Sequence, residues 1–254
     1  MAEIKGIFFD QDGVIIDTER DGHRVAFNQT FKSFGLNFQW NVEEYHKLLQ
    51  IAGGKERMAY YLHTKGFNKP INPTEEERLI KDMHKAKTSK FIELIDSGKL
   101  PLRPGIKRLM KEANQAGIQI GICTTSDEKA AKAISTKYLN DITFGFILAS
   151  DEVDKKKPDP AIYLLALQKS QLKPKECVVI EDSRNGVLAA KRAGISTLVT
   201  TNPYTEKEDL SGADIILTCL GDQNGEKGKL VCSTRPFTFD GVLHLQQFID
   251  YFLS

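Results

Sequence analysis

The chain has 254 residues, 41% of them hydrophobic, which is enough to bury a full core in one large domain or two smaller ones. Its formal net charge of +1 gives no electrostatic basis for binding nucleic acid or an anionic membrane surface. No stretch approaches the roughly 18 consecutive apolar residues of a membrane span, and a core strand pattern begins at residue 4, which leaves no room for a signal peptide. We therefore expect a cytoplasmic protein, or a plastid protein if a transit peptide has been removed, and a monomer because no long apolar helix stripe demands a partner.

The first predicted element is a buried strand over residues 4–9, which delivers two carboxylates at its end. Asp10 and Asp12 are two residues apart, and Gly13 follows them. Ligands of open α/β sheets bind beyond the carboxyl ends of the strands, so chemistry is expected here. Two carboxylates this close repel each other, so they need a divalent cation between them, or one stays protonated for acid/base work. Taken alone, the segment also fits an ordinary Asp-Gly turn.

The part of the chain that follows carries no strand pattern. From about residue 17 to residue 98 the sequence is charged and helical in character. Two prolines, Pro101 and Pro104, then stiffen the return to apolar sequence. We expect a helical domain at 17–98 that is inserted into a core formed by 1–16 and 99–254.

A second apolar run, residues 118–123, ends in three hydroxyl side chains. These are Thr124, Thr125 and Ser126, and a helix-like stretch starts at Asp127. Hydroxyls and free backbone N–H groups at a helix start form an anion site. Capping of that helix is the alternative role for Thr125 and Ser126, and the two roles can coexist.

Two further motifs supply a cation and a pair of acids. Lys157 lies in a Lys-Pro-Asp-Pro motif ahead of a helical pattern, where the two prolines fix the backbone and so hold the lysine in one place. The apolar strand over residues 176–180 ends in Glu181 and Asp182. Carboxylates are the hard oxygen ligands that Mg²⁺ prefers, so this strand end is a candidate metal site.

Apolar, often β-branched runs that are mostly separated by helical patterns predict the fold class. Such an alternation is typical of an α/β protein with a doubly wound parallel sheet. Towards the end of the chain, residues 221–229 predict a polar surface loop and a last helix follows from about Asp240. The expected strands are residues 4–9, 118–123, 143–148, 176–180, 195–200 and 213–217.

An aspartate pair, a hydroxyl, a lysine and an acidic pair thus follow one another, each at the carboxyl end of a strand or at a helix entrance. In this order the chain resembles the haloacid dehalogenase (HAD) superfamily, in which an inserted helical cap closes over the site. The dehalogenase branch lacks the second aspartate, so the resemblance implies phosphoryl transfer. Asp10 would attack phosphorus to form an aspartyl phosphate, and Asp12 would protonate the leaving oxygen and then deprotonate water. Thr124 and Lys157 would hold the phosphoryl group.

The same resemblance implies a metal ion. Asp10, the backbone carbonyl of Asp12 and Asp182 would bind Mg²⁺, with Glu181 beside them. Phosphoryl transfer requires neutralisation of several negative charges, which a metal ion, a lysine and hydroxyl donors supply together.

The inserted domain resembles a narrower group. Residues 17–28 and 53–58 are similar to the CbbY group of HAD enzymes, the xylulose-1,5-bisphosphate phosphatases. A bisphosphate needs cationic donors for its distal phosphate, and paired glycines let the backbone approach a ligand. Without the resemblance, a solvated charged helix and a packed or surface histidine are the alternatives. The expected substrate-binding residues are Glu19, His23, Gly53, Gly54, Lys55, Arg57, Lys87, Thr125 and Ser126.

We therefore expect a Mg²⁺-dependent phosphatase that acts on a small sugar bisphosphate, with xylulose-1,5-bisphosphate as the first candidate. A β-phosphoglucomutase-like mutase shares the motifs and would return the phosphate to the sugar rather than to water. The motifs are also compatible with a broad-specificity sugar-phosphate phosphatase and with a non-catalytic sugar-phosphate sensor. The expected partner is a small phosphosugar, and neither nucleic acid nor a membrane.

Overall fold

The computed structural model describes residues 3–49, 51, 53–68, 70–126 and 128–253. The chain forms two compact units, which we call the sheet unit and the helical unit. The sheet unit comprises Met1–Asp17 and Pro101–Ser254, and the helical unit comprises Thr18–Leu100. These limits lie within two residues of the domain boundaries expected from the sequence.

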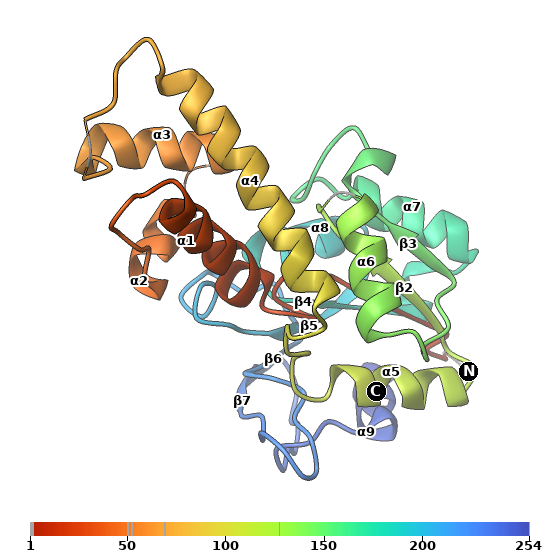
Figure 1. Ribbon diagram of the computed structural model, residues 1–254. Coiled ribbons are helices and arrows are strands. Elements are labelled where there is room, and N and C mark those ends of the chain that lie inside the picture. Colours follow the sequence, from red (N-terminus) through yellow and green to blue (C-terminus); the bar gives the residue numbers. More distant parts are fainter. Residues whose placement is uncertain (1–2, 50, 52, 69, 127, 254) are drawn as a thin grey trace. The chain divides into compact units, whose positions relative to one another are not determined.

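The sheet unit is built on seven strands in the order β3-β2-β1-β4-β5-β6-β7 (Figure 1). All neighbouring strands are parallel except the last pair, β6 and β7. The expectation of a doubly wound α/β fold is therefore confirmed. The strands are β1 (Gly6–Phe9), β2 (Gln119–Cys123), β3 (Phe146–Leu148), β4 (Cys177–Glu181), β5 (Ser196–Thr200), β6 (Ile215–Leu217) and β7 (Leu230–Ser233).

The register of the central strands brings their carboxyl ends together. Phe9 of β1 pairs with Ile122 of β2 on one side and with Ile180 of β4 on the other. All of β1 and β4 is buried, as expected for central parallel strands covered on both faces. The side chains that follow these strands therefore meet at one edge of the sheet, where the candidate catalytic residues lie.

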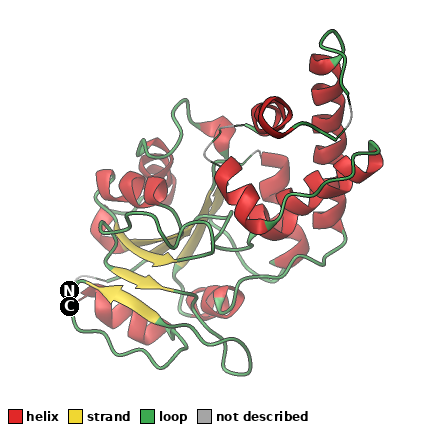
Figure 2. Cartoon of the chain, turned by 90° about the vertical axis from the view of Figure 1, so that its left-hand side faces the viewer, coloured by secondary structure: helices red, strands yellow, loops and turns green. Residues whose placement is uncertain are grey.

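Helices cover both sides of this sheet (Figure 2). α7 (Ala161–Ser170) and α8 (Arg184–Arg192) share a buried apolar cluster with β1, β2 and β4. α5 (Ile106–Gln115) packs against α9 (Leu245–Leu253) on the other side, and α6 (Glu128–Tyr138) packs on β3 (Figure 1). The helix expected from Asp127 is α6, and Asp127 itself lies outside the described residues. The short helical turns are η2 (Ser150–Glu152) and η3 (Pro174–Glu176).

The end of the chain differs from the sequence expectation. The sequence predicted no element between the loop at 221–229 and the last helix, but β7 (Leu230–Ser233) adds an antiparallel edge strand there, and the last helix begins at Leu245 rather than near Asp240. Three of the four side chains of β7 are exposed and the fourth is half-buried. The apolar run of β7 is short, Leu230 to Cys232, and it follows a polar, glycine-containing stretch, so it is a weaker strand signal than the longer runs of the central strands.

The helical unit consists of η1 (Thr18–His23), a π-helical turn, followed by α1 (Arg24–Ser33), α2 (Val42–Leu48), α3 (Gly54–Lys65) and α4 (Glu76–Asp96). No strand occurs among its described residues. Its core is aromatic, because rings from α1, α2 and the connections between the helices pack against one another. The fully buried rings are Phe27, Phe31, Trp40, Tyr45 and Phe67.

Nowhere in the part of the chain that the structure describes does a helix combine the length and apolar character needed to cross a bilayer.

Candidate active site

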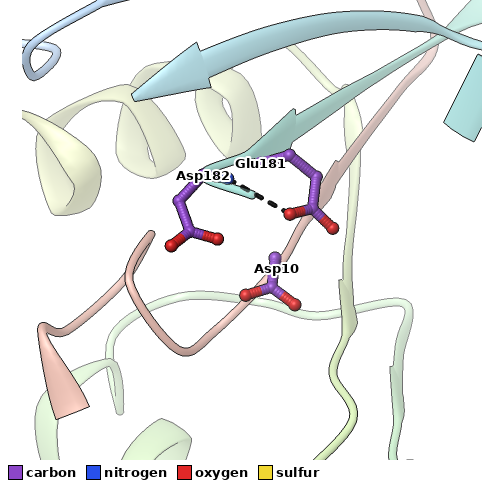
Figure 3. Close-up of side chains that lie close together, drawn as sticks. All are labelled: Asp10, Glu181 and Asp182. Atoms are coloured by element: carbon purple, nitrogen blue, oxygen red, sulfur yellow. Dashed lines mark hydrogen bonds between the residues drawn. The ribbon is translucent and has the colours of Figure 1, made fainter. Parts of the chain in front are cut away.

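Three buried carboxylates gather at the carboxyl edge of the sheet unit. Asp10 follows β1, Glu181 is the last residue of β4 and Asp182 follows it (Figure 3). One oxygen from each carboxylate lies within 4.8 Å of the other two. Asp10 and Asp182 are 6% and 7% exposed, and Glu181 is fully buried. Neighbouring parallel strands thus place the acids that the sequence singled out in one cluster.

Lys157 is the cation of this cluster. Its Nζ donates to Asp10 Oδ1 at 2.5 Å, to Glu181 Oε1 at 2.6 Å and to the carbonyl oxygen of Cys123 at 2.9 Å. Burial alone would lower the pKa of Lys157, but the adjacent charges of Asp10 and Glu181 raise it above its ordinary value. Lys157 therefore carries its positive charge at neutral pH.

Both oxygens of Glu181 are engaged by donors. Oε1 accepts from the Tyr163 hydroxyl at 2.6 Å in addition to Lys157. Oε2 accepts from the backbone N–H of Asp182 at 3.1 Å and from the Ser183 hydroxyl at 3.4 Å. Glu181 is thus held as a rigid acceptor that fixes Lys157. Tyr163 lies in an apolar helical pattern that indicates only core packing, so the sequence does not mark it as a site residue.

Asp12 has a different environment from Asp10, although the two are close in sequence. Its Oδ2 accepts from the Thr124 hydroxyl at 3.1 Å and from the Ser126 hydroxyl at 2.6 Å. Thr124 Oγ1 in turn accepts the backbone N–H of Ser126 at 3.0 Å. The hydroxyls of Thr124 and Ser126, expected to contact the substrate, contact the Asp12 carboxylate in this structure. Thr125 is exposed.

The pattern of charge in the acidic cluster fits a divalent cation. Burial raises the pKa of Asp10 to about 8, against the opposing effect of Lys157 and with the help of the Glu181 and Asp12 charges. Burial likewise raises the pKa of Asp182 well above its usual range. Within the described residues, Asp10 Oδ2 and Asp182 Oδ1 accept no hydrogen bond. These two hard oxygen donors, in a site with more negative than positive charge, suit Mg²⁺.

In the helical unit, Glu19 and Arg57 are joined through a tyrosine. The Tyr45 hydroxyl donates to Glu19 Oε2 at 2.6 Å and accepts from Arg57 at 3.2 Å. Arg57 Nε also donates to the carbonyl oxygen of Ile51 at 2.9 Å. The guanidinium is therefore fixed in place rather than free in solvent, as a solvated helix start would leave it.

Lys87 and His23 form a second pair in the helical unit. Lys87 is only 8% exposed, and its Nζ lies 2.7 Å from His23 Nδ1 and over the ring of Phe27 at 4.9 Å. Lys87 is therefore a buried cation and does not lie on a solvated basic face. Gly54 is close-packed, since a Cβ there would lie 3.2 Å from the Phe27 ring. Gly53 has a φ of +97°, which favours glycine, and Lys55 is exposed.

Comparison with known proteins identifies the family. Residues 4–194 match the haloacid dehalogenase-like hydrolases. The chain belongs to this family. A CBBY-like protein of Arabidopsis thaliana is 43% identical over 248 residues, which cover 96% of this chain and 76% of the relative. The crystal structure of a CbbY variant from Rhodobacter sphaeroides in complex with xylulose-(1,5)bisphosphate is 39% identical, covers 87% of this chain and 97% of its own, and has a TM-score of 0.69.

Further solved HAD structures share the architecture without close sequence similarity. The β-phosphoglucomutase from Clostridium difficile is 22% identical, with a TM-score of 0.65 and coverage of 98% and 97%. A likeness at this identity shows the fold alone. The present chain, a HAD-like hydrolase that carries the second aspartate at Asp12, is a phosphatase.

Proposed function

We propose that this HAD phosphatase removes one phosphate from a small sugar bisphosphate through a covalent intermediate on Asp10, with Mg²⁺ as cofactor. The observation that carries the proposal is the separation of two neighbouring aspartates. Asp10 is buried against Lys157 in the acidic cluster, whereas Asp12 is bound by two hydroxyls outside it. One carboxylate is thus arranged to attack, and the other to carry a proton.

In the first half-reaction the Asp10 carboxylate attacks phosphorus, so that a bond from Asp10 to phosphorus forms and the ester bond to the sugar breaks. Asp12 gives its proton to the departing sugar oxygen. In the second half-reaction Asp12 takes a proton from water, which attacks phosphorus and releases inorganic phosphate and the Asp10 carboxylate. The covalent intermediate divides one difficult displacement into two easier ones.

The remaining residues of the site act on charge. Lys157, held by Glu181 and the Cys123 carbonyl, would stabilise the negative charge of the transferring phosphoryl group. Asp10, Asp182 and the Asp12 carbonyl would hold Mg²⁺, which when bound neutralises phosphate charge and lets Asp10 stay ionised beside it. Thr124 would bind the phosphoryl group after its hydroxyl leaves Asp12.

We infer that the substrate is xylulose-1,5-bisphosphate. The CbbY structure in complex with this sugar supports the inference, because the similarity extends through 87% of the present chain. In the helical unit, Arg57, Lys87 and Lys55 are cations that suit the distal phosphate, and Arg57 is already oriented by Tyr45. Glu19 and His23 are the proposed partners of sugar hydroxyls.

The test is release of inorganic phosphate in the presence of Mg²⁺ from xylulose-1,5-bisphosphate, ribulose-1,5-bisphosphate, glucose 1,6-bisphosphate and β-glucose 1-phosphate. We expect a strong preference for the first compound. Indifference among the bisphosphates would indicate a broad-specificity phosphatase. Conversion of hexose phosphates without accumulation of inorganic phosphate would indicate a mutase. Asp10→Asn is the control for catalysis, since it should bind sugar bisphosphate without turnover. Sugar binding by a wild-type protein that releases no phosphate would indicate a sensor.

A further inference from the structure

A buried asparagine outside the motifs binds one oxygen of the acidic cluster. Asn202 lies in the loop after β5 (Ser196–Thr200) and is 7% exposed. Its Nδ2 donates to Asp182 Oδ2 at 2.7 Å. The two residues are 20 positions apart in sequence, and no sequence motif marks Asn202.

The backbone fixes which end of the Asn202 amide faces Asp182. Asn202 Oδ1 accepts the backbone N–H of Tyr204 at 2.9 Å, so the NH₂ group is the end left for the carboxylate. The loop itself is closed by Thr205, whose hydroxyl accepts the Asn202 N–H at 3.2 Å and whose N–H donates to the Asn202 carbonyl at 3.0 Å. These loop hydrogen bonds hold the side-chain NH₂ of Asn202 toward Asp182.

Gly13 encloses the same oxygen from the strand β1 side. Its φ is +90°, and a Cβ at this position would lie 2.2 Å from Asp182 Oδ2 and 2.8 Å from Asn202 Nδ2. Asp182 Oδ2 is thus confined between the amide and the Gly13 backbone. Figure 3 shows one oxygen of Asp182 facing Asp10. This agrees with the distances in the cluster, where one oxygen of each of the three carboxylates lies within 4.8 Å of the other two.

We propose that Asn202 is a positioning residue for the metal ligand Asp182: it occupies Oδ2 and so presents Oδ1 to the cation. A neutral amide suits this role, because a lysine or arginine at the same place would reduce the net negative charge that attracts a divalent ion. The inference rests on the proposed Mg²⁺ site. It adds a loop after β5 to the set of elements that build this site.

The experiment is a Mn²⁺ titration of the metal-free protein, in which free Mn²⁺ is followed by electron paramagnetic resonance. Asn202→Ala removes both side-chain hydrogen bonds. In Asn202→Ser the hydroxyl can still accept the Tyr204 N–H but is too short to reach Asp182. We expect both variants to bind Mn²⁺ about 10- to 100-fold more weakly than wild type, the usual cost of losing an outer-shell partner.

The matched control is Asn114→Ser. Asn114 also uses both ends of its amide, on the backbone of Thr143 at 2.8 and 3.0 Å, and these bonds lie outside the acidic cluster. We expect wild-type Mn²⁺ affinity for this variant. Thermal unfolding without metal establishes that each variant is folded. In Asn202→Ser, raising the Mg²⁺ concentration should restore turnover.

Wild-type Mn²⁺ affinity in Asn202→Ser would overturn the proposal, because Asn202 would then only close its own loop. Failure of high Mg²⁺ to restore turnover in a folded Asn202→Ser protein would also count against it. A wild-type protein that binds no Mn²⁺ would overturn the metal site itself, and with it this inference. The failure of the two proposals is therefore distinguishable.

Discussion

The charge on Asp10 depends on what neutralises the acidic cluster. Burial raises its pKa from 3.8 to about 8 in the metal-free protein. The folded state thus binds the Asp10 proton more tightly than the unfolded chain does. The contribution of this proton to the free energy of unfolding is fully present below about pH 4 and is lost as the pH rises through about 8. We expect the unfolding temperature of the metal-free protein to fall over this range. Added Mg²⁺ should raise the unfolding temperature more at about pH 8 than at about pH 4, because fewer protons compete for the carboxylates at the higher pH.

Differential scanning calorimetry of metal-free wild-type and Asp10→Asn protein measures this effect. The asparagine does not titrate, so its unfolding temperature should fall less between about pH 4 and pH 8. Parallel curves for the two proteins would show that Asp10 does not carry the raised pKa.

Asp12 is proposed to transfer the proton, so the effect of removing it should depend on the leaving group. Asp12→Ala should slow hydrolysis of a sugar phosphate by about 10²- to 10⁴-fold, since an alkoxide leaves poorly without a proton. A nitrophenolate needs no proton to leave, so formation of the phosphoenzyme from p-nitrophenyl phosphate should be slowed much less. Rapid-quench measurement of the first half-reaction with both substrates gives the comparison. Equal slowing of the two would instead indicate a structural role for Asp12.

At the scale of elements, the C-terminal segment is fastened to the start of α5. Asp222 Oδ2 accepts the backbone N–H of Gly105, the residue that precedes this helix, at 2.9 Å. Near the other end of α5, Glu112 Oε2 accepts the N–H of Leu245, where α9 begins, at 2.9 Å. Residues 223–227 and 229 are exposed, as expected of a polar surface loop, and Asp222 fastens the start of this loop to the sheet unit.

Removing the Asp222 carboxylate should therefore lower stability without touching catalysis. We expect Asp222→Ala to cost about 0.5–2 kcal/mol of unfolding free energy, the range for a lost helix N-terminal cap. Urea denaturation is the measurement. Asp250→Ala is the control, because the Asp250 carboxylate accepts from the exposed Gln246, one turn away on α9. A cost no larger than that of the control would mean that the cap contributes nothing.

What the sequence predicts at this scale follows from burial. Central strands are apolar on both faces, so their runs and the acids at their ends are visible without a structure. β7 contributes only a short apolar run after a polar stretch, and its side chains are mostly exposed, so its strand signal is weak. Tyr163 and Asn202 act through single hydrogen bonds across 18 and 20 positions of the chain. No local pattern marks such contacts, because Tyr163 looks like a core residue and Asn202 like a turn residue.

Across the whole molecule, the sheet unit carries the proposed reacting groups, and the helical unit carries the cations proposed to bind the distal phosphate. The two chain segments that connect the units contact each other within the sheet unit. Ile16 forms an antiparallel bridge with Leu102, and the buried Arg103 binds Asp17 Oδ1 at 2.8 Å. Arg103 also donates to the Thr201 carbonyl at 2.6 Å. The inserted helical unit thus starts and ends at one fixed point of the sheet unit.

This division predicts that chemistry and specificity can be separated by mutation. Arg57→Ala should raise the KM for a sugar bisphosphate by about 10- to 100-fold, equivalent to the roughly 1.5–3 kcal/mol of a hydrogen bond to a charged group. It should leave p-nitrophenyl phosphate hydrolysis unchanged, because that substrate has no distal phosphate. Arg78→Ala removes an equal charge from the exposed face of α4. It should change neither the KM for the sugar bisphosphate nor the hydrolysis of p-nitrophenyl phosphate. Equal losses on both substrates in Arg57→Ala would place Arg57 in the structure of the helical unit, where it already binds Tyr45 and Ile51.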